Sequence, residues 1–201
     1  SEANGVAFES RGGPVEVRLG DSSLTGRPLE VRAGGYSVAY TPVLPLGLGG
    51  AGRAADRAPV KDGDQVVYRD VHPGIDYRYT ILPFGVKEDI VLREPGPLST
   101  FAFQIDAPRL KPILVEDGSV ELRDGETVVF RLPAPFMVDS ADPDGTRGGG
   151  VRSDAVSYRL LSVAGVDVLV IEADPEWPAD PARVYPVYLD PTTENELASA
   201  D

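Results

Sequence analysis

The sequence predicts an all-β fold, an antiparallel β-sandwich built either as one sandwich or as two packed lobes. Three observations support this. Gly (22) and Pro (19) exceed a fifth of the 201 residues and interrupt every long run, which leaves no room for several long helices. Short apolar runs alternate with polar residues at a period of two, which is typical of strands. Asp-Gly pairs, which favour tight turns, separate these runs.

The expected strands follow one another along the chain at hairpin spacing. Alternating runs cover residues 15–19, 156–160 and 166–170. Residues 120–130 read as a hairpin that turns at Asp124-Gly125, and residues 156–172 as another that turns near Ala164-Gly165. The composition of residues 44–64 and 139–150 predicts surface loops.

A further strand is expected to begin at Ile75, directly after the turn pair Pro73-Gly74. Ile75, Tyr77 and Tyr79 alternate with polar residues, so we expect them to share one face directed toward the core. The chain then returns along residues 85–92. Asp76 and Asp89 are expected to be architectural acids that accept backbone N–H groups or pair with Arg78 or Lys87.

The domain prediction is one β-sandwich over residues 1–191, with a sub-lobe boundary near 133–150 and a tail or linker over 192–201. The chain starts at Ser1 and its only Met is Met137, which is expected of a processed or excised piece.

Composition excludes several classes of function from this chain. The formal net charge of −13 argues against binding nucleic acid or an anionic lipid surface. No apolar run approaches the ~20 residues of a membrane-spanning helix, so no membrane insertion is expected. The absence of Cys and the single His exclude thiolate chemistry and histidine-rich metal centres. No cofactor is predicted.

Candidate ligand sites are weak. Asp139, Asp142 and Asp144 form the best candidate for calcium, which takes hard oxygen ligands, but their spacing departs from an EF-hand loop, and a solvated acidic turn is expected instead. The glycines of residues 47–52 match a dinucleotide pattern without its strand and helix, and indicate a loop. His72 has no partner visible in the sequence, and is expected to be a surface or turn residue.

Two segments resemble a known pattern. Residues 66–79 (VVYRDVHPGIDYRY) and 85–94 (GVKEDIVLRE), followed by 128–137 (VVFRLPAPFM) and 174–191 (DPEWPADPARVYPVYLDP), resemble the β-rich module ahead of DNRLRE, LamG-like or RHS/YD-repeat regions. Such modules occur in large secreted actinobacterial surface proteins and polymorphic toxins. The pattern more often has Tyr at the position of His72, which weakens a catalytic role for this residue.

The resemblance implies a secreted or cell-surface, non-catalytic structural and interaction module, and no enzyme. The alternatives are a carbohydrate-binding module, with aromatic side chains as a sugar platform, and a carboxylate-dependent hydrolase. The expected partners are neighbouring domains of the same polypeptide, or a cell-surface glycan or protein. The predicted structural motif residues, with no catalytic role, are Tyr68, Asp70, Pro73, Gly74, Asp76, Tyr77, Tyr79, Asp89 and Trp177.

Overall fold

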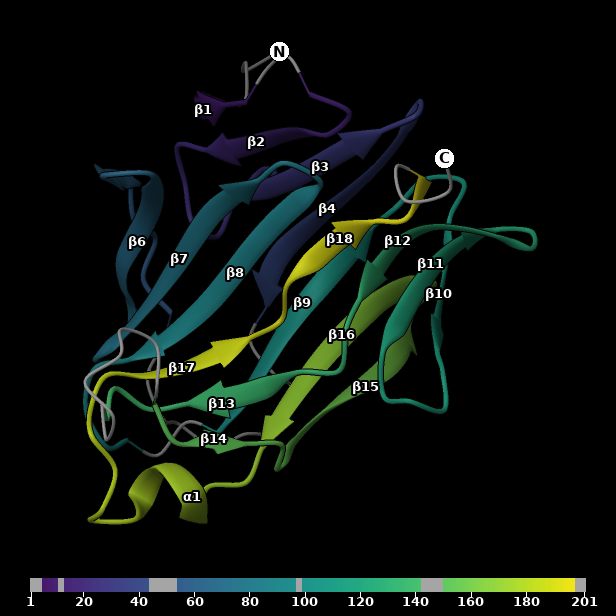
Figure 1. Cartoon of the computed structure of the whole chain (residues 1–201). Coiled ribbons are helices and arrows are strands. Elements are labelled where there is room, and N and C mark those ends of the chain that lie inside the picture. Colours follow the sequence, from purple (N-terminus) through teal and green to yellow (C-terminus); the bar gives the residue numbers. More distant parts are fainter. Residues whose placement is uncertain (1–4, 11–12, 44–53, 97–98, 142–149, 198–201) are drawn as a thin grey trace.

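The computed structural model describes residues 5–10, 13–43, 54–96, 99–141 and 150–197. Two antiparallel sheets pack face to face in this part of the chain, with a single short helix beside them (Figure 1). The predicted all-β sandwich is therefore confirmed. The expected glycine-rich loop at residues 47–52 lies outside the described residues.

The first sheet has seven strands in the order β1-β2-β3-β4-β9-β16-β15. It joins the N-terminal hairpins to the late hairpin β15–β16 through β9, which pairs with β4 on one side and β16 on the other. Its strands are β1 (Val6–Glu9), β2 (Glu16–Gly20), β3 (Leu29–Ala33), β4 (Tyr36–Val43), β9 (Thr100–Asp106), β15 (Val156–Val163) and β16 (Val166–Ala173).

The second sheet has eleven strands and divides at β8 (Gly85–Leu92). One edge of β8 pairs with β7, and the other pairs with β17 at one end and with β18 at the other. β17 leads on to β13 and β14, and β18 leads on to β12, β11 and β10. The remaining strands are β5 (Val60–Asp62), β6 (Gln65–His72), β7 (Ile75–Leu82), β10 (Lys111–Leu114), β11 (Val120–Asp124), β12 (Thr127–Leu132), β13 (Phe136–Val138), β14 (Arg152–Ser153), β17 (Val187–Asp190) and β18 (Thr193–Asn195).

The turn chemistry of the sequence matches the observed hairpins. β11 and β12 turn at Gly125-Glu126, directly after Asp124, and Gly125 has a φ of +59°. β15 and β16 turn at Ala164 (φ +52°) and Gly165 (φ +80°), a conformation in which both central residues have positive φ. Both predicted hairpins are therefore confirmed.

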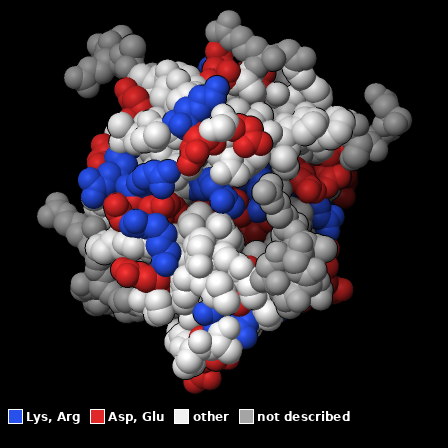
Figure 2. Space-filling view, turned by 60° about the vertical axis from the view of Figure 1, so that its left-hand side comes forward, with Lys and Arg blue, Asp and Glu red and all other residues white. Residues whose placement is uncertain are grey.

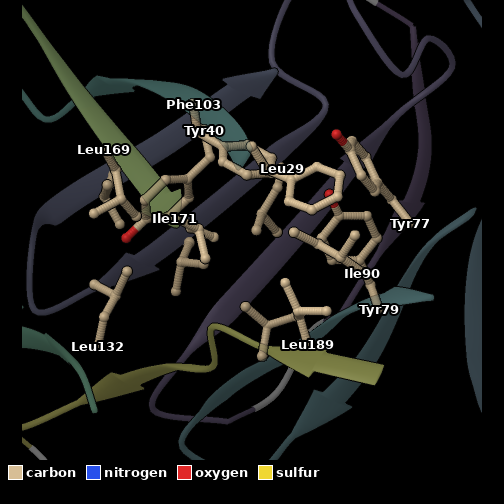
Figure 3. Packing of buried hydrophobic residues seen from close by; sticks show 14 of the residues in the cluster. Leu29, Tyr40, Tyr77, Tyr79, Ile90, Phe103, Leu132, Leu169, Ile171 and Leu189 are labelled. Atoms are coloured by element: carbon tan, nitrogen blue, oxygen red, sulfur yellow. The ribbon is translucent and has the colours of Figure 1, made fainter. Parts of the chain in front are cut away.

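The core lies between the two sheets and is built from their inward residues (Figure 3). Ile75, Tyr77 and Tyr79 point into it and are 6%, 2% and 2% exposed, as their alternation predicts. Tyr68 packs edge to face against Tyr79 with ring centroids 5.8 Å apart. Tyr68 also donates a 2.6 Å hydrogen bond to the Gly20 carbonyl of the other sheet.

Two segments are more ordered than the sequence indicates. Residues 192–201 are expected to be a tail or linker, but Thr193–Asn195 forms β18 between β8 and β12. Thr193 is 1% exposed and its hydroxyl lies 3.4 Å from that of Tyr40, so β18 belongs to the core. Within the expected loop 44–64, Val60–Asp62 forms the edge strand β5.

The helix α1 (Glu176–Ala179) has four residues and holds Trp177. No helix in the described ranges is both long and apolar enough to cross a membrane.

We predict that core and surface phenylalanines respond very differently to truncation. Phe130 is 0% exposed, and Phe130→Ala should lower the free energy of unfolding by about 3–5 kcal/mol through the cavity it leaves. Phe84 is 55% exposed at the β7–β8 turn, and Phe84→Ala should change it by no more than about 0.5 kcal/mol. Urea denaturation of both variants measures the difference. Equal midpoints would contradict the assigned core.

Candidate functional site: the two faces of strands β7 and β8

Charged and aromatic residues of the first segment that carries the family resemblance, residues 66–79 and 85–94, lie on β7 and β8. These two strands pair along their full length. The register sets Arg78 opposite Asp89 and Tyr79 opposite Glu88. Because successive side chains of a strand point to opposite faces, the first pair lies on the outer face of the sheet and the second pair in the core. The site therefore has a charged half on the outer face of the sheet and a second half in the core.

On the outer face, Asp89 is the centre of a buried ion-pair network. Its side chain is 1% exposed, and its Oδ2 accepts hydrogen bonds from Nε (3.0 Å) and Nη2 (2.7 Å) of Arg78. Lys87 also pairs with Asp89, and its Nζ lies 3.1 Å from Oδ2 of Asp190 on β17. The Arg78 guanidinium lies 4.6 Å from the centre of the Tyr188 ring, a cation–π distance. The network links β7, β8 and β17.

A second acid, Asp76, supports the bend of β6. The β6–β7 register shifts between Tyr68 and His72, and Asp70 in this bulge has a φ of +53°. Oδ1 of Asp76 accepts the backbone N–H of Asp70 at 2.7 Å, which satisfies a donor that the bulge removes from the ladder. Burial raises the pKa of the Asp76 carboxyl, and the charge of Arg69 opposes this shift. Nε of Arg93 is 3.4 Å from the same carboxylate.

The same arrangement, a buried carboxylate beneath arginines, recurs at two other places. Glu30 on β3 lies under Arg18, Arg27 and Arg32, and its side chain is 5% exposed. Glu121 on β11 lies under Arg123 and Arg131. In Figure 2, blue and red atoms interleave in a band across the molecule. These acids hold the guanidinium groups in place over the strands.

The buried half of the site centres on Glu88, whose side chain points into the core with Val86 and Ile90 of the same strand. Tyr79 donates its hydroxyl to Oε1 of Glu88 at 3.0 Å. Burial raises the pKa of the Glu88 carboxyl to about 8. The hydrogen bond from Tyr79 lowers it, and the charges of Asp89 and Asp190 raise it further. At neutral pH this side chain is therefore mostly a neutral acid.

Glu88 was missed by the sequence reasoning, although a signal was present. Val86, Glu88, Ile90 and Leu92 occupy alternate positions of one strand, so an acid stands in an otherwise apolar row. The outer-face pair was anticipated, because Asp89 was expected to pair with Arg78 or Lys87.

The structure places His72 differently from the prediction. It was expected at the surface or in a turn, but it is the last residue of β6 and is 8% exposed. Its ring centroid is 6.4 Å from that of Phe101, and its Nε2 is 3.4 Å from the hydroxyl of Tyr77. The turn pair Pro73-Gly74 follows it, with Gly74 at a φ of +73°.

Backbone hydrogen bonds and an ion pair hold the side chain of Asp139 in place. Its buried side chain accepts backbone N–H groups of Ala141 (3.0 Å) and Val151 (2.8 Å) through Oδ1, and of Val184 (3.3 Å) through Oδ2. Nη1 of Arg183 is 3.3 Å from Oδ2, and the Arg183 guanidinium lies 4.8 Å from the centre of the Trp177 ring. Asp142 and Asp144 lie outside the described residues. Among the residues described, no cluster of three or more acidic or histidine side chains could hold a metal ion.

Three curated relatives are similar to this chain, each 40% identical over 139 residues, or 69% of the chain. Two of them are the tRNA nuclease WapA of Bacillus subtilis strain 168 and the tRNA(Glu)-specific nuclease WapA of B. subtilis subsp. natto. A wall-associated protein of Geobacillus stearothermophilus is 30% identical over 130 residues. The chain spans 6% of the length of the nucleases and half of the wall-associated protein.

No family model matches the chain. No solved structure matches it either. The finer resemblance to DNRLRE, LamG-like or RHS/YD-repeat regions of actinobacterial proteins therefore remains a prediction.

The names of these relatives correct three predictions made from the sequence. The chain was expected to be a non-catalytic module, with carbohydrate binding as an alternative, to have no enzymatic role and to have no nucleic-acid partner. Its relatives are named as nucleases of tRNA, which are catalytic proteins with a nucleic-acid substrate. Net charge and the lack of catalytic motifs describe these 201 residues, whereas the matched segment is 6% of each nuclease.

We predict that ionisation of Glu88 makes the fold less stable as pH rises. In the unfolded chain its carboxyl titrates near 4.3, but in the folded chain near 8, so the folded state alone keeps the proton between these values. This stabilisation is complete below about pH 4.3 and is lost as pH rises to about 8, a total of roughly 5 kcal/mol at about 1.4 kcal/mol per unit.

Urea denaturation from pH 5 to 9 tests this prediction. Glu88→Gln should flatten the decline and leave the variant more stable than the wild type above pH 8. Glu126→Gln, at the exposed β11–β12 turn, should keep the wild-type slope. A wild-type slope in Glu88→Gln would show that the carboxyl is not the group responsible.

We predict that the Asp89 network stabilises the fold, unlike an exposed ion pair. Asp89→Asn removes the buried anion that Arg78 and Lys87 share, and should lower the free energy of unfolding by about 3 kcal/mol. Asp154, whose side chain is 75% exposed, pairs with Arg152, and Asp154→Asn should change it by less than about 0.5 kcal/mol. Thermal melts of the two variants at one pH provide the comparison, and similar melting temperatures would contradict it.

Proposed function

We propose that this chain is a β-sandwich unit of a long cell-surface protein that cleaves tRNA. The observation that carries the proposal is the 40% identity over 139 residues shared with proteins named as tRNA nucleases. Identity at this level over a segment longer than one hundred residues supports common descent of that segment. The identity to a wall-associated protein, of which the chain spans half, supports the location at the cell surface.

Surface location and a tRNA substrate together favour a toxin. The tRNA of the producing cell lies inside its membrane, so a nuclease displayed outside meets its substrate in another cell. This agrees with the polymorphic-toxin parent that the sequence resemblance implies. In such a protein the segment would have to stay folded outside the cell, and a core without cysteine is insensitive to the redox state of that compartment.

We predict that the complete product of the gene that encodes this chain cleaves tRNA. Purified product should fragment total tRNA on a denaturing gel, and an antibody raised against the 201-residue chain should label intact cells. An inactivating change elsewhere in the product that abolishes cleavage without unfolding it excludes a contaminating ribonuclease. A folded complete product with no cleavage of any tRNA would contradict the proposal.

A further inference from the structure

The β15–β16 hairpin carries an apolar outer face at the end of the seven-stranded sheet. Val163 pairs with Val166 and Leu161 with Val168, so these four side chains form a block on the face directed away from the core. Leu161, Val163 and Val166 are 37%, 45% and 38% exposed. Leu169 and Ile171 of the same strand point inward and are 2% and 0% exposed (Figure 3). β16 is therefore apolar on both faces, which is expected of a strand covered on both sides.

β15 is also a terminal strand of its sheet (Figure 1). In the described ranges its eight residues pair with β16 alone. A two-residue turn makes Val163 and Val166 a hydrogen-bonded pair, so the backbone N–H and C=O groups of Leu160 and Ser162 point to the other side. No Pro, Gly or bulge interrupts this edge, and its one charged residue, Arg159, lies 2.6 Å from Glu172 of the same hairpin. The edge therefore lacks the prolines and bulges that usually prevent an edge strand from pairing with another strand.

We propose that the edge of β15, with Leu161 and Val163 on its outer face, is the docking site for an apolar β-strand from another part of the same polypeptide. This inference rests on the proposed function, because it requires the chain to belong to a longer protein. The matched segment makes up 6% of the nucleases, so such a protein has much further sequence to supply the strand.

The character of the surface favours this occupant over others. A second copy would also bring a net charge of −13, and the repulsion opposes pairing of two such chains. A strand from the same polypeptide does not require two such chains to approach each other. Its effective concentration reaches about millimolar for short flexible connections. An apolar edge strand that pairs on one side only, within the described ranges, matches β-strand addition, in which main-chain hydrogen bonds supply affinity and side chains supply specificity.

Cysteine labelling tests the proposal, because the chain has no Cys of its own. Val163→Cys is introduced into the 201-residue chain and into the complete gene product, in which any cysteine outside these residues is changed to Ser. The rate of reaction with a maleimide-polyethylene glycol reagent is then measured in both. Glu126→Cys, at the exposed turn of the other sheet, is the matched control, and Leu161→Cys replaces Val163→Cys if that variant does not fold.

We expect Val163→Cys to react at least tenfold more slowly in the complete product than in the 201-residue chain, and Glu126→Cys to react equally in both. Equal rates at Val163 would overturn the proposal. Slow reaction in the 201-residue chain together with a dimeric mass by light scattering would also overturn it, because the occupant would be a second copy. tRNA cleavage by the same preparations is scored separately: protection without cleavage rejects only the nuclease function, and cleavage without protection rejects only the docking site.

Discussion

Strand β8 is the element on which the rest of the structure depends. It pairs with β7 along one edge and with β17 and β18 along the other, so the middle and the end of the chain meet on it. Its inner face contributes Val86, Glu88 and Ile90 to the core, and its outer face contributes Lys87 and Asp89 to the ion-pair network. Because β17 and β18 come last in the chain, the second sheet closes only when contacts of long sequence separation form.

Several of the acidic residues have a structural role, which explains part of the acidic composition. Asp76, Asp89, Asp190, Glu30 and Glu121 are all nearly buried, and each lies beneath basic side chains from its own or a neighbouring strand. A buried carboxylate costs desolvation energy, and the paired guanidinium or ammonium groups offset it. Removing one partner of a buried pair therefore leaves the desolvation cost of the other group uncompensated. An exposed pair such as Arg152–Asp154 contributes little to stability. Net charge alone says little about which surface of such a chain meets a partner.

Turns and strand alternation made most of the fold predictable. Gly125 and the pair Ala164-Gly165 mark hairpins because their backbone takes positive φ. The Tyr77–Tyr79 row faces the core because its alternate neighbours are polar. β18 was not predictable, because Thr-Glu-Asn carries no apolar alternation and is held by strands on both sides, β8 and β12. The buried position of His72 follows from its pairing with Ile75, because paired residues share one face of a sheet and Ile75 points into the core.

The valines of β16 show where the alternation of apolar and polar residues no longer determines which face of a strand points to the core. Residues 166–173 are apolar at nearly every position, so their sequence alone does not say whether Val168 or Leu169 faces the core. The answer comes from β9, whose Phe103 pairs with Leu169 and whose Gln104 pairs with Val168. The polar partner assigns Val168 to the outer face, and the same pairing leaves an apolar surface outside the core. The apolar residues on the two faces of β16 thus have different surroundings: Leu169 and Ile171 pack in the core of the sandwich, whereas Val166 and Val168 form an outer apolar block with Leu161 and Val163 of β15.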